Sequence, residues 1–185
     1  MERLSDNYYV EKTRLGESDC FAPLLERYSA QVFSLIIKIV GNREDAEELT
    51  QDVFVKAFHS LSSFREDCSF STWIYRIAYN MAVSSTRRKK MEIMPIDENL
   101  ISGFPDEPDG MLSGTVDSEE RLVHLELALK QLTPEERAMI MFFYKDDKSM
   151  EEIAIITGLT ETNVKTKIFR IRKKLFVLMK MMEQK

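Results

Sequence analysis

Hydrophobic residues recur at spacings of three and four along most of this chain, which is the period of helices with one buried face. In the first half the pattern is clearest from Leu24 to Ile39, and Gly41 follows it as a helix stop. Asn42 comes next and suits the N-cap of a second helix, because the turn after it is acidic. A third helix is predicted to begin near Ser69 or Ser71 and to run into a basic stretch at residues 87–90.

Cap signals divide the second half into four helices, the last of them long. Three of these signals place Asp, Thr or Ser three residues before Glu, the spacing of a capping box or a close variant. The pairs are Asp117 with Glu120, Thr133 with Glu136, and Ser149 with Glu152. Thr160 is predicted to cap the last and longest helix, which would run toward the C-terminus.

Residues 91–116 interrupt the helical period. They hold three of the five prolines, three of the six glycines and six acidic residues without a basic one. Such a composition predicts an extended, flexible linker. The sequence therefore predicts an all-α protein of two small helical domains, 1–90 and 117–185, joined by a flexible acidic linker at 91–116.

Composition narrows the possible functions. With 44% hydrophobic and 31% charged residues, the 185-residue chain fits a soluble protein. No apolar run could span a bilayer and the N-terminus lacks a signal core, so we expect a cytoplasmic protein without membrane insertion. Cys20 and Cys68 stand alone, which predicts no disulfide, metal or cofactor site. His59 and His124 are not part of any nucleophile or carboxylate motif, so an enzyme is not expected.

The distribution of charge points to nucleic acid. The net charge is -5, yet residues 69–90 carry five basic residues and no acidic one, and residues 160–185 carry eight basic and two acidic residues. Two basic segments separated by an acidic one suggest two contacts with a polyanion.

The last two helices are typical of a helix-turn-helix. A tight turn at residues 158–160 joins them, and a buried stripe is expected at Val164, Ile168, Ile171 and Leu175. The opposite side would face a DNA groove. It carries Thr162, Lys165, Thr166, Phe169, Arg170 and Lys173. The alternative is an ordinary amphipathic helix with a solvated basic face.

Two earlier helices also have a distinctive outer face. On the third predicted helix, aromatic, amide and basic groups share one sector, and such groups suit the binding of unpaired bases. These are Trp73, Arg76, Asn80, Ser84 and Arg87. The alternative is that the aromatic residues belong to the hydrophobic core. On the second, Val55 and Phe58 lie beside Glu48 and Gln51, which predicts a docking surface unless another helix of the domain covers it.

In three segments this sequence resembles bacterial RNA polymerase sigma factors of the extracytoplasmic-function (ECF) group. The segments are DAEELTQDVFVKAFHSL (45–61), FREDCSFSTWIYRIAYNMA (64–82) and LTPEERAMI with MEEIAIITGLTETNVKTKIFRIRKKL (132–140, 150–175). The resemblance implies that domain two, 1–90, binds the β′ clamp helices of core RNA polymerase and melts the minus-ten element. It also implies that domain four, 117–185, binds the β flap tip and reads the minus-thirty-five element, so that promoter DNA is bound both as duplex and as single strands. The linker is implied to pass through the RNA exit channel.

The resemblance also assigns roles to residues. It implies clamp binding by Glu48, Gln51, Asp52, Val55 and Phe58, and base capture by the loop from Phe64 and Arg65 to Cys68. For the minus-ten contacts it adds Tyr75 to the third-helix residues, and Arg88 extends that basic face. An anti-sigma factor is a further candidate partner. The C-terminal tail at 175–182 either offers a binding surface for it or packs against the rest of the C-terminal domain. The alternative function is a stand-alone helix-turn-helix regulator, which would not explain the helix that bears Asn80.

Overall fold

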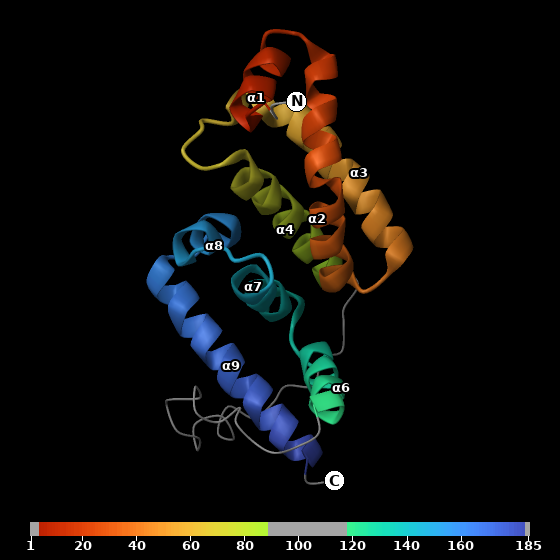
Figure 1. The fold of residues 1–185 in the computed structure, drawn as a ribbon, viewed down its shortest axis with the longest axis vertical. Coiled ribbons are helices and arrows are strands. Elements are labelled where there is room, and N and C mark those ends of the chain that lie inside the picture. Colours follow the sequence, from red (N-terminus) through yellow and green to blue (C-terminus); the bar gives the residue numbers. More distant parts are fainter. Residues whose placement is uncertain (1–3, 89–117, 184–185) are drawn as a thin grey trace.

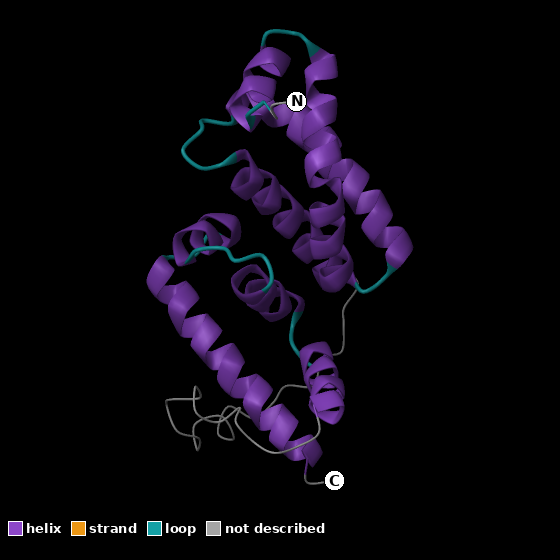
Figure 2. Cartoon of the chain, in the orientation of Figure 1, coloured by secondary structure: helices purple, strands orange, loops and turns teal. Residues whose placement is uncertain are grey.

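The computed structural model describes residues 4–88 and 118–183, and these are helical without any strand (Figures 1 and 2). The N-terminal half contains α1 (Asp6–Arg14), η1 (Ser18–Phe21), α2 (Ala22–Val40), α3 (Arg43–Ser60), η2 (Leu61–Ser63) and α4 (Phe70–Arg88). The C-terminal half contains α6 (Ser118–Lys130), α7 (Pro134–Tyr144), α8 (Met150–Thr157) and α9 (Glu161–Glu183). The all-α fold class is thus confirmed. The predicted linker, 91–116, lies outside the described residues.

Helices α2, α3 and α4 pack against one another to form the N-terminal half. The predicted end of α2 and start of α3 are confirmed. Gly41 ends α2 with a φ of 74°, and the Asn42 side chain accepts a 3.0 Å hydrogen bond from the Asp45 backbone N–H. At the start of α4, Ser69 Oγ accepts from the Thr72 N–H at 3.2 Å. Helix α1 was not expected from the sequence, because Val10 is its one buried residue and no apolar period marks it.

Helices α6 to α9 form the C-terminal half, and their caps follow the sequence. Complete capping boxes open α7 at Thr133 and α8 at Ser149, and the Thr160 hydroxyl accepts from the Asn163 N–H at 3.3 Å. The predicted cap at Asp117 lies outside the described residues. The tail packs on its own domain, because Leu178 and Met179 of α9 are buried against Ala128 of α6.

The two halves also pack against each other. Helix α4 contacts α7 and α8, and α2 contacts α7, so the C-terminal half lies along one side of the N-terminal bundle (Figure 1). The Arg137 guanidinium joins the two halves. It donates to the carbonyl of Lys38 on α2 at 2.9 Å and to three carbonyls at the end of α6 and in the turn after it. Among the described helices, none is long and apolar enough to cross a membrane.

Candidate polymerase and nucleic-acid interfaces

The helix-turn-helix consists of α8, the turn at 158–160 and the first half of α9. Gly158 adopts a left-handed φ of 73°, a conformation that side-chain-bearing residues rarely adopt, and it accounts for the sharp turn. Val164, Ile168 and Ile171 are buried as the period predicts, while Leu175 is partly buried. The opposite face of α9 is therefore turned outward along its first three turns.

Most of the predicted recognition residues lie on that outward face. Thr162, Lys165, Thr166 and Arg170 are exposed, and Phe169 is partly exposed. Lys173 differs from the prediction, because it is only 7% exposed and its ammonium lies 5.6 Å from the centre of the Phe169 ring. A long side chain can fold back along its own helix, and helical period does not fix that choice. In this arrangement Lys173 is not displayed to a duplex.

Helix α4 presents a second polar face. Arg76, Asn80, Ser84 and Arg87 are exposed along one side, and Trp73 at the start of that side is partly exposed. Trp73 is also part of an aromatic stack, with its ring centre 5.0 Å from Phe64 and 5.7 Å from Phe70. The face therefore begins at a half-covered ring and continues through an amide and two cations. The side chain of Arg88 lies outside the described part of the chain.

Two other residues expected on this surface are buried. Tyr75 is 5% exposed because it packs against Phe142 of α7, with ring centres 6.0 Å apart. Burial raises the pKa of its phenol to about 12. Phe64 is 3% exposed within the aromatic stack. Neither ring is free to contact a base in this arrangement, because Phe142 covers Tyr75 while Phe70 and Trp73 cover Phe64. The family resemblance suggested both contacts, and the sequence did not reveal which neighbours cover the two rings.

The loop that follows η2 is held by a residue that the sequence did not suggest. Arg14, at the end of α1, donates to the carbonyl of Leu61 at 3.2 Å, to the carbonyl of Phe64, and to the Glu66 carboxylate at 2.8 Å. Its guanidinium also lies 5.7 Å from the centre of the Phe64 ring. Glu66 has a φ of 63°, so the loop needs such support. Arg65 stays exposed, and both arginines line a pocket of about 670 Å³ with Phe58 and His59. Since Arg14 is 47 or more residues from the groups it binds, no local sequence signal could have found it.

The predicted docking surface on α3 is exposed. Val55 is 56% and Phe58 39% exposed, and no helix of the described chain covers them. Glu48, Gln51 and Asp52 are exposed as well. The Phe58 ring also packs edge-on against Phe21 of η1 at 5.3 Å, so it has a structural contact that Val55 lacks. An apolar strip bordered by carboxylates suits a partner helix with basic and apolar side chains.

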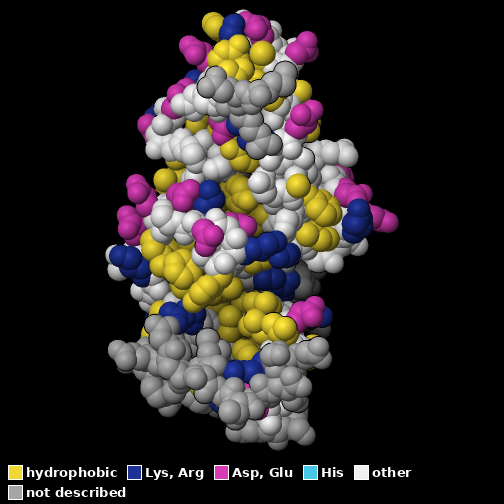
Figure 3. Space-filling model, in the orientation of Figure 1, with side chains coloured by type: hydrophobic (Ala, Val, Ile, Leu, Met, Phe, Trp, Pro, Cys, Tyr) yellow, Lys and Arg dark blue, Asp and Glu magenta, His cyan; other side chains and the backbone are white. Residues whose placement is uncertain are grey.

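The described residues hold no cluster of His, Cys, Asp and Glu that could bind a metal ion. Basic, hydrophobic and acidic side chains are interspersed over the face seen in Figure 3, with a group of basic side chains near the middle of the molecule. Most of the predicted site residues that the structure describes lie on exposed helix faces. Faces of this kind can bind extended partners.

Comparison with known protein families gives two matches. The model of Sigma-70 region 2 matches residues 24–91, and that of Sigma-70 region 4 matches residues 122–175. Two curated relatives align over 177 residues. The ECF RNA polymerase sigma factor SigW of Bacillus subtilis (strain 168) is 30% identical, covering 90% of this chain and 92% of its own. The ECF RNA polymerase sigma-E factor of Escherichia coli (strain K12) is 32% identical, covering 92% of each.

Solved structures share the fold. CnrH in complex with the cytosolic domain of CnrY aligns with a TM-score of 0.65 at 22% identity, over 92% of this chain and 94% of that one. The sigma factor RpoE in complex with the anti-sigma factor NepR from Bartonella quintana aligns with a TM-score of 0.61 at 22% identity, over 86% and 96%. The exposed faces of α3, α4 and α9 are thus parts of a fold found in sigma factors.

Proposed function

Since the chain belongs to the ECF group of RNA polymerase sigma factors, we propose that its three exposed helix faces divide the work of promoter recognition. Members of this family are transcription initiation factors that bind RNA polymerase and promoter DNA, and they are not normally enzymes. The observation that carries the proposal is that α4 and α9 each expose a row of amide, hydroxyl and basic groups. A stand-alone regulator would need the second of these rows but not the first.

Domain two, 1–90, attaches the chain to the polymerase. The α3 strip binds the clamp helices of the β′ subunit through Val55 and Phe58, whose apolar surface leaves water on docking. Glu48 and Asp52 meet basic groups of the clamp, while Gln51 supplies neutral hydrogen bonds. Exposure of all five residues supports this role.

The α4 face of the same domain holds the melted minus-ten strand. Trp73 supplies a ring for stacking, Asn80 both donates to and accepts from a base edge, and Arg76 and Arg87 hold the backbone. Ser84 and Arg88 extend this track. Arg65, which stays exposed, and the loop that follows it to Cys68 capture an unpaired base, as the family resemblance implies. Capture stabilises the open duplex by a few kcal/mol and so offsets part of the cost of melting.

Domain four, 117–185, reads the minus-thirty-five duplex with α9 and contacts the β flap tip. Arg170 and Lys165 reach base edges or phosphates in the major groove. The hydroxyls of Thr162 and Thr166 can hydrogen-bond to base edges there, and the Phe169 ring can contact a thymine methyl group. The chain acts in the cytoplasm with the polymerase. An anti-sigma factor is a candidate regulator, since one similar solved structure contains an anti-sigma factor and the other a partner's cytosolic domain.

Co-elution with core RNA polymerase tests this function. The chain should co-elute with core polymerase in gel filtration, and the complex should retain a fork template with single-stranded minus-ten DNA that neither component retains alone. A stand-alone regulator would bind duplex DNA without polymerase and would not co-elute with it, which would contradict the proposal.

A further inference from the structure

Arg14, the last residue of α1, contacts the end of η2 and the loop after it at three separate points. Its Nε donates to the Leu61 carbonyl at 3.2 Å, Nη1 donates to the Glu66 carboxylate at 2.8 Å, and Nη2 donates to the Phe64 carbonyl. The three acceptors thus surround one planar guanidinium, whose donors point in fixed directions. A lysine ammonium carries all its donors on one nitrogen and could not span the same acceptors.

These contacts act where the backbone of the loop is least favourable. Glu66 has a φ of 63°, in the left-handed region that glycine adopts most readily. A residue with a side chain stays there only when its surroundings stabilise it. The ion pair with Arg14 fixes the Glu66 side chain, and the hydrogen bond to the Phe64 carbonyl fixes the backbone two residues earlier. Arg14 therefore stabilises the strained part of the loop from both sides.

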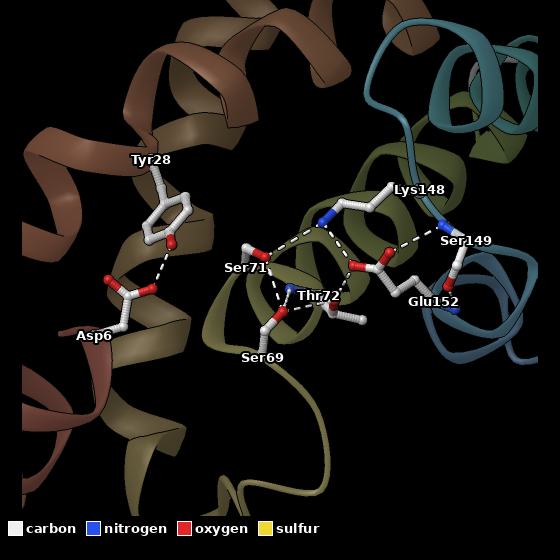
Figure 4. A network of polar contacts seen from close by, with 8 residues as sticks. All are labelled: Asp6, Tyr28, Ser69, Ser71, Thr72, Lys148, Ser149 and Glu152. Carbon is white, nitrogen blue, oxygen red and sulfur yellow. Dashed lines mark hydrogen bonds and ion pairs between the residues drawn. The ribbon is translucent and has the colours of Figure 1, made fainter.

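Helix α1 is itself fastened to the N-terminal bundle, so Arg14 has a fixed position. Asp6, at the start of α1, accepts a hydrogen bond from the Tyr28 hydroxyl and pairs with Arg27, both on α2. Figure 4 shows Tyr28 pointing from its helix toward Asp6. Val10, in the middle of α1, is fully buried. The helix thus forms a support that is anchored at its start and holds the loop at its end.

The loop at residues 64–69 carries groups that the proposed function assigns to the melted strand. Arg65 is exposed on it, and the Phe64 ring lies 5.0 Å from Trp73, where the outward face of α4 begins. At its far end Ser69 caps α4. The loop is therefore fixed at its end by α4 and at its start by Arg14, which determines the direction in which Arg65 leaves the domain.

We propose that Arg14 is a positioning residue for capture of the melted minus-ten strand, because it holds the loop in its binding conformation before DNA arrives. The inference rests on the proposed function, since it concerns the same loop. The match to Sigma-70 region 2 begins at residue 24 and so does not include α1. Arg14 acts through the loop and contacts no base itself.

A loop that is ordered in advance binds DNA more tightly, because its conformational entropy is not lost on binding. Fixing the backbone of one residue costs about as much free energy as a tenfold change in affinity. Release of even one residue of the loop would therefore lower the affinity for unpaired DNA about tenfold. The loss should be confined to DNA that the loop captures, and duplex DNA bound by α9 should be unaffected.

Fork templates with abasic sites test this role. Core polymerase loaded with the parent chain is titrated with a fork template whose minus-ten strand is single, and with versions that lack one unpaired base at a time. The missing base that lowers the parent's affinity most marks the captured position. Arg14→Ala and Arg14→Lys are then compared with Lys12→Ala, a control on the same helix whose ion pair with Glu17 lies outside the loop.

Arg14→Ala should bind the intact fork template about tenfold more weakly than the parent, and Arg14→Lys should show most of that loss. On the template that lacks the captured base, both variants should bind as the parent does, a selectivity that general damage to the domain would not produce. Lys12→Ala should match the parent on every template. Unaltered affinity in both Arg14 variants, or an equal loss on intact and abasic templates, would overturn the proposal.

Limited digestion of the free chain with trypsin measures the hold on the loop without polymerase. Trypsin cleaves after Arg65 only when the surrounding segment opens, so a looser loop is cut faster. Cleavage there should be faster in Arg14→Ala and Arg14→Lys than in the parent and Lys12→Ala, and equal rates would overturn the proposal. In contrast, a parent complex whose affinity no abasic site lowers would count against the proposed function alone.

Discussion

Thr72 of α4 donates a 3.0 Å hydrogen bond to the carboxylate of Glu152 on α8, a residue 80 positions later in the chain. Glu152 also completes the capping box of α8 by accepting from the Ser149 backbone N–H. One carboxylate thus stabilises the start of the helix-turn-helix and links it to the helix proposed to hold melted DNA. The local half of this role was predictable from the spacing of Ser149 and Glu152, and the long-range half was not.

The charge on Glu152 should make this link dependent on pH. Burial would raise its pKa, but hydrogen bonds from Ser149, Lys148 and Thr72 outweigh burial and hold the pKa below the usual 4.5. A lowered carboxyl pKa stabilises the folded state above the usual value, and this stabilisation is lost as the pH falls through the folded pKa. Glu152→Gln keeps the capping box and should cost about 1 kcal/mol or less near neutral pH. In urea unfolding, the difference in the free energy of unfolding between Glu152→Gln and the parent chain should disappear as the pH falls below 4.5.

A control for this prediction is Glu151→Gln, which removes a charge from the same helix turn without contacting Thr72 or Lys148. Its free energy of unfolding should differ less from that of the parent chain, and this difference should change less as the pH falls. An equal gap for both variants would mean that the helix end alone, and not the long-range link, accounts for the effect.

Arg14→Ala should loosen the loop at residues 64–69 without unfolding the domain. Its guanidinium holds the carbonyls of Leu61 and Phe64, and the Phe64 ring lies 5.0 Å from Trp73. Trp73 is the single tryptophan of the chain, so its fluorescence reports on this stack. We expect an emission change in Arg14→Ala and little change in Lys12→Ala, two residues earlier on α1. Helicity should stay the same by circular dichroism. Unaltered emission would show that the aromatic stack holds the loop unaided.

Val55→Ser should weaken assembly with core polymerase at no cost to folding, because Val55 is 56% exposed. Loss of a buried valine at the interface corresponds to about 1–2 kcal/mol, or roughly a tenfold change in affinity. Phe58→Ser should cost stability as well, since its ring packs on Phe21. Fluorescence titration and thermal melts distinguish the two effects. Leu15→Ser, at a site 73% exposed outside α3, is the control. Equal losses of affinity in Leu15→Ser and Val55→Ser would exclude a specific docking surface.

Asn80→Ala should reduce strand opening while sparing assembly with polymerase. The side chain is exposed between Arg76 and Ser84, where an amide can pair with an unpaired base. Loss of about 1.4 kcal/mol would lower open-complex formation roughly tenfold. Permanganate reactivity of thymines measures opening, and a template with a pre-melted minus-ten bubble should recover part of the loss. Unchanged reactivity on duplex promoter would be evidence that Asn80 has no role in melting.

Local signals predicted the helices well. Gly41, Asn42, Thr133 and Gly158 each fix a helix end through their own backbone or one nearby hydrogen bond, so sequence alone located those boundaries. The exposed faces of α3, α4 and α9 also followed from helical period. Helix α1 escaped prediction because its apolar residues do not recur at helical spacing and Val10 is its one buried residue.

What the sequence did not reveal depends on distant partners. Tyr75 was expected to face DNA, yet Phe142 covers it, and the two residues are 67 positions apart. Arg14 binds a loop about fifty residues away. Lys173 is a local exception, because its side chain lies near the ring of Phe169, four residues earlier on the same helix, and helical period does not fix the direction of a long side chain. Period tells which residues share a helix face, but it does not tell which other helix or side chain lies over that face.

Above all, the chain is expected to direct core RNA polymerase to promoters with two separated elements. This role can be tested on all promoters of a genome at once. Core RNA polymerase transcribes genomic DNA in vitro with and without the protein, and the 5′ ends of the transcripts are mapped. We predict a new set of start sites in the presence of the protein, with two shared sequence motifs near minus-ten and minus-thirty-five at a constant spacing. Identical start sites with and without the protein, or new sites that share no motif, would contradict the proposed role.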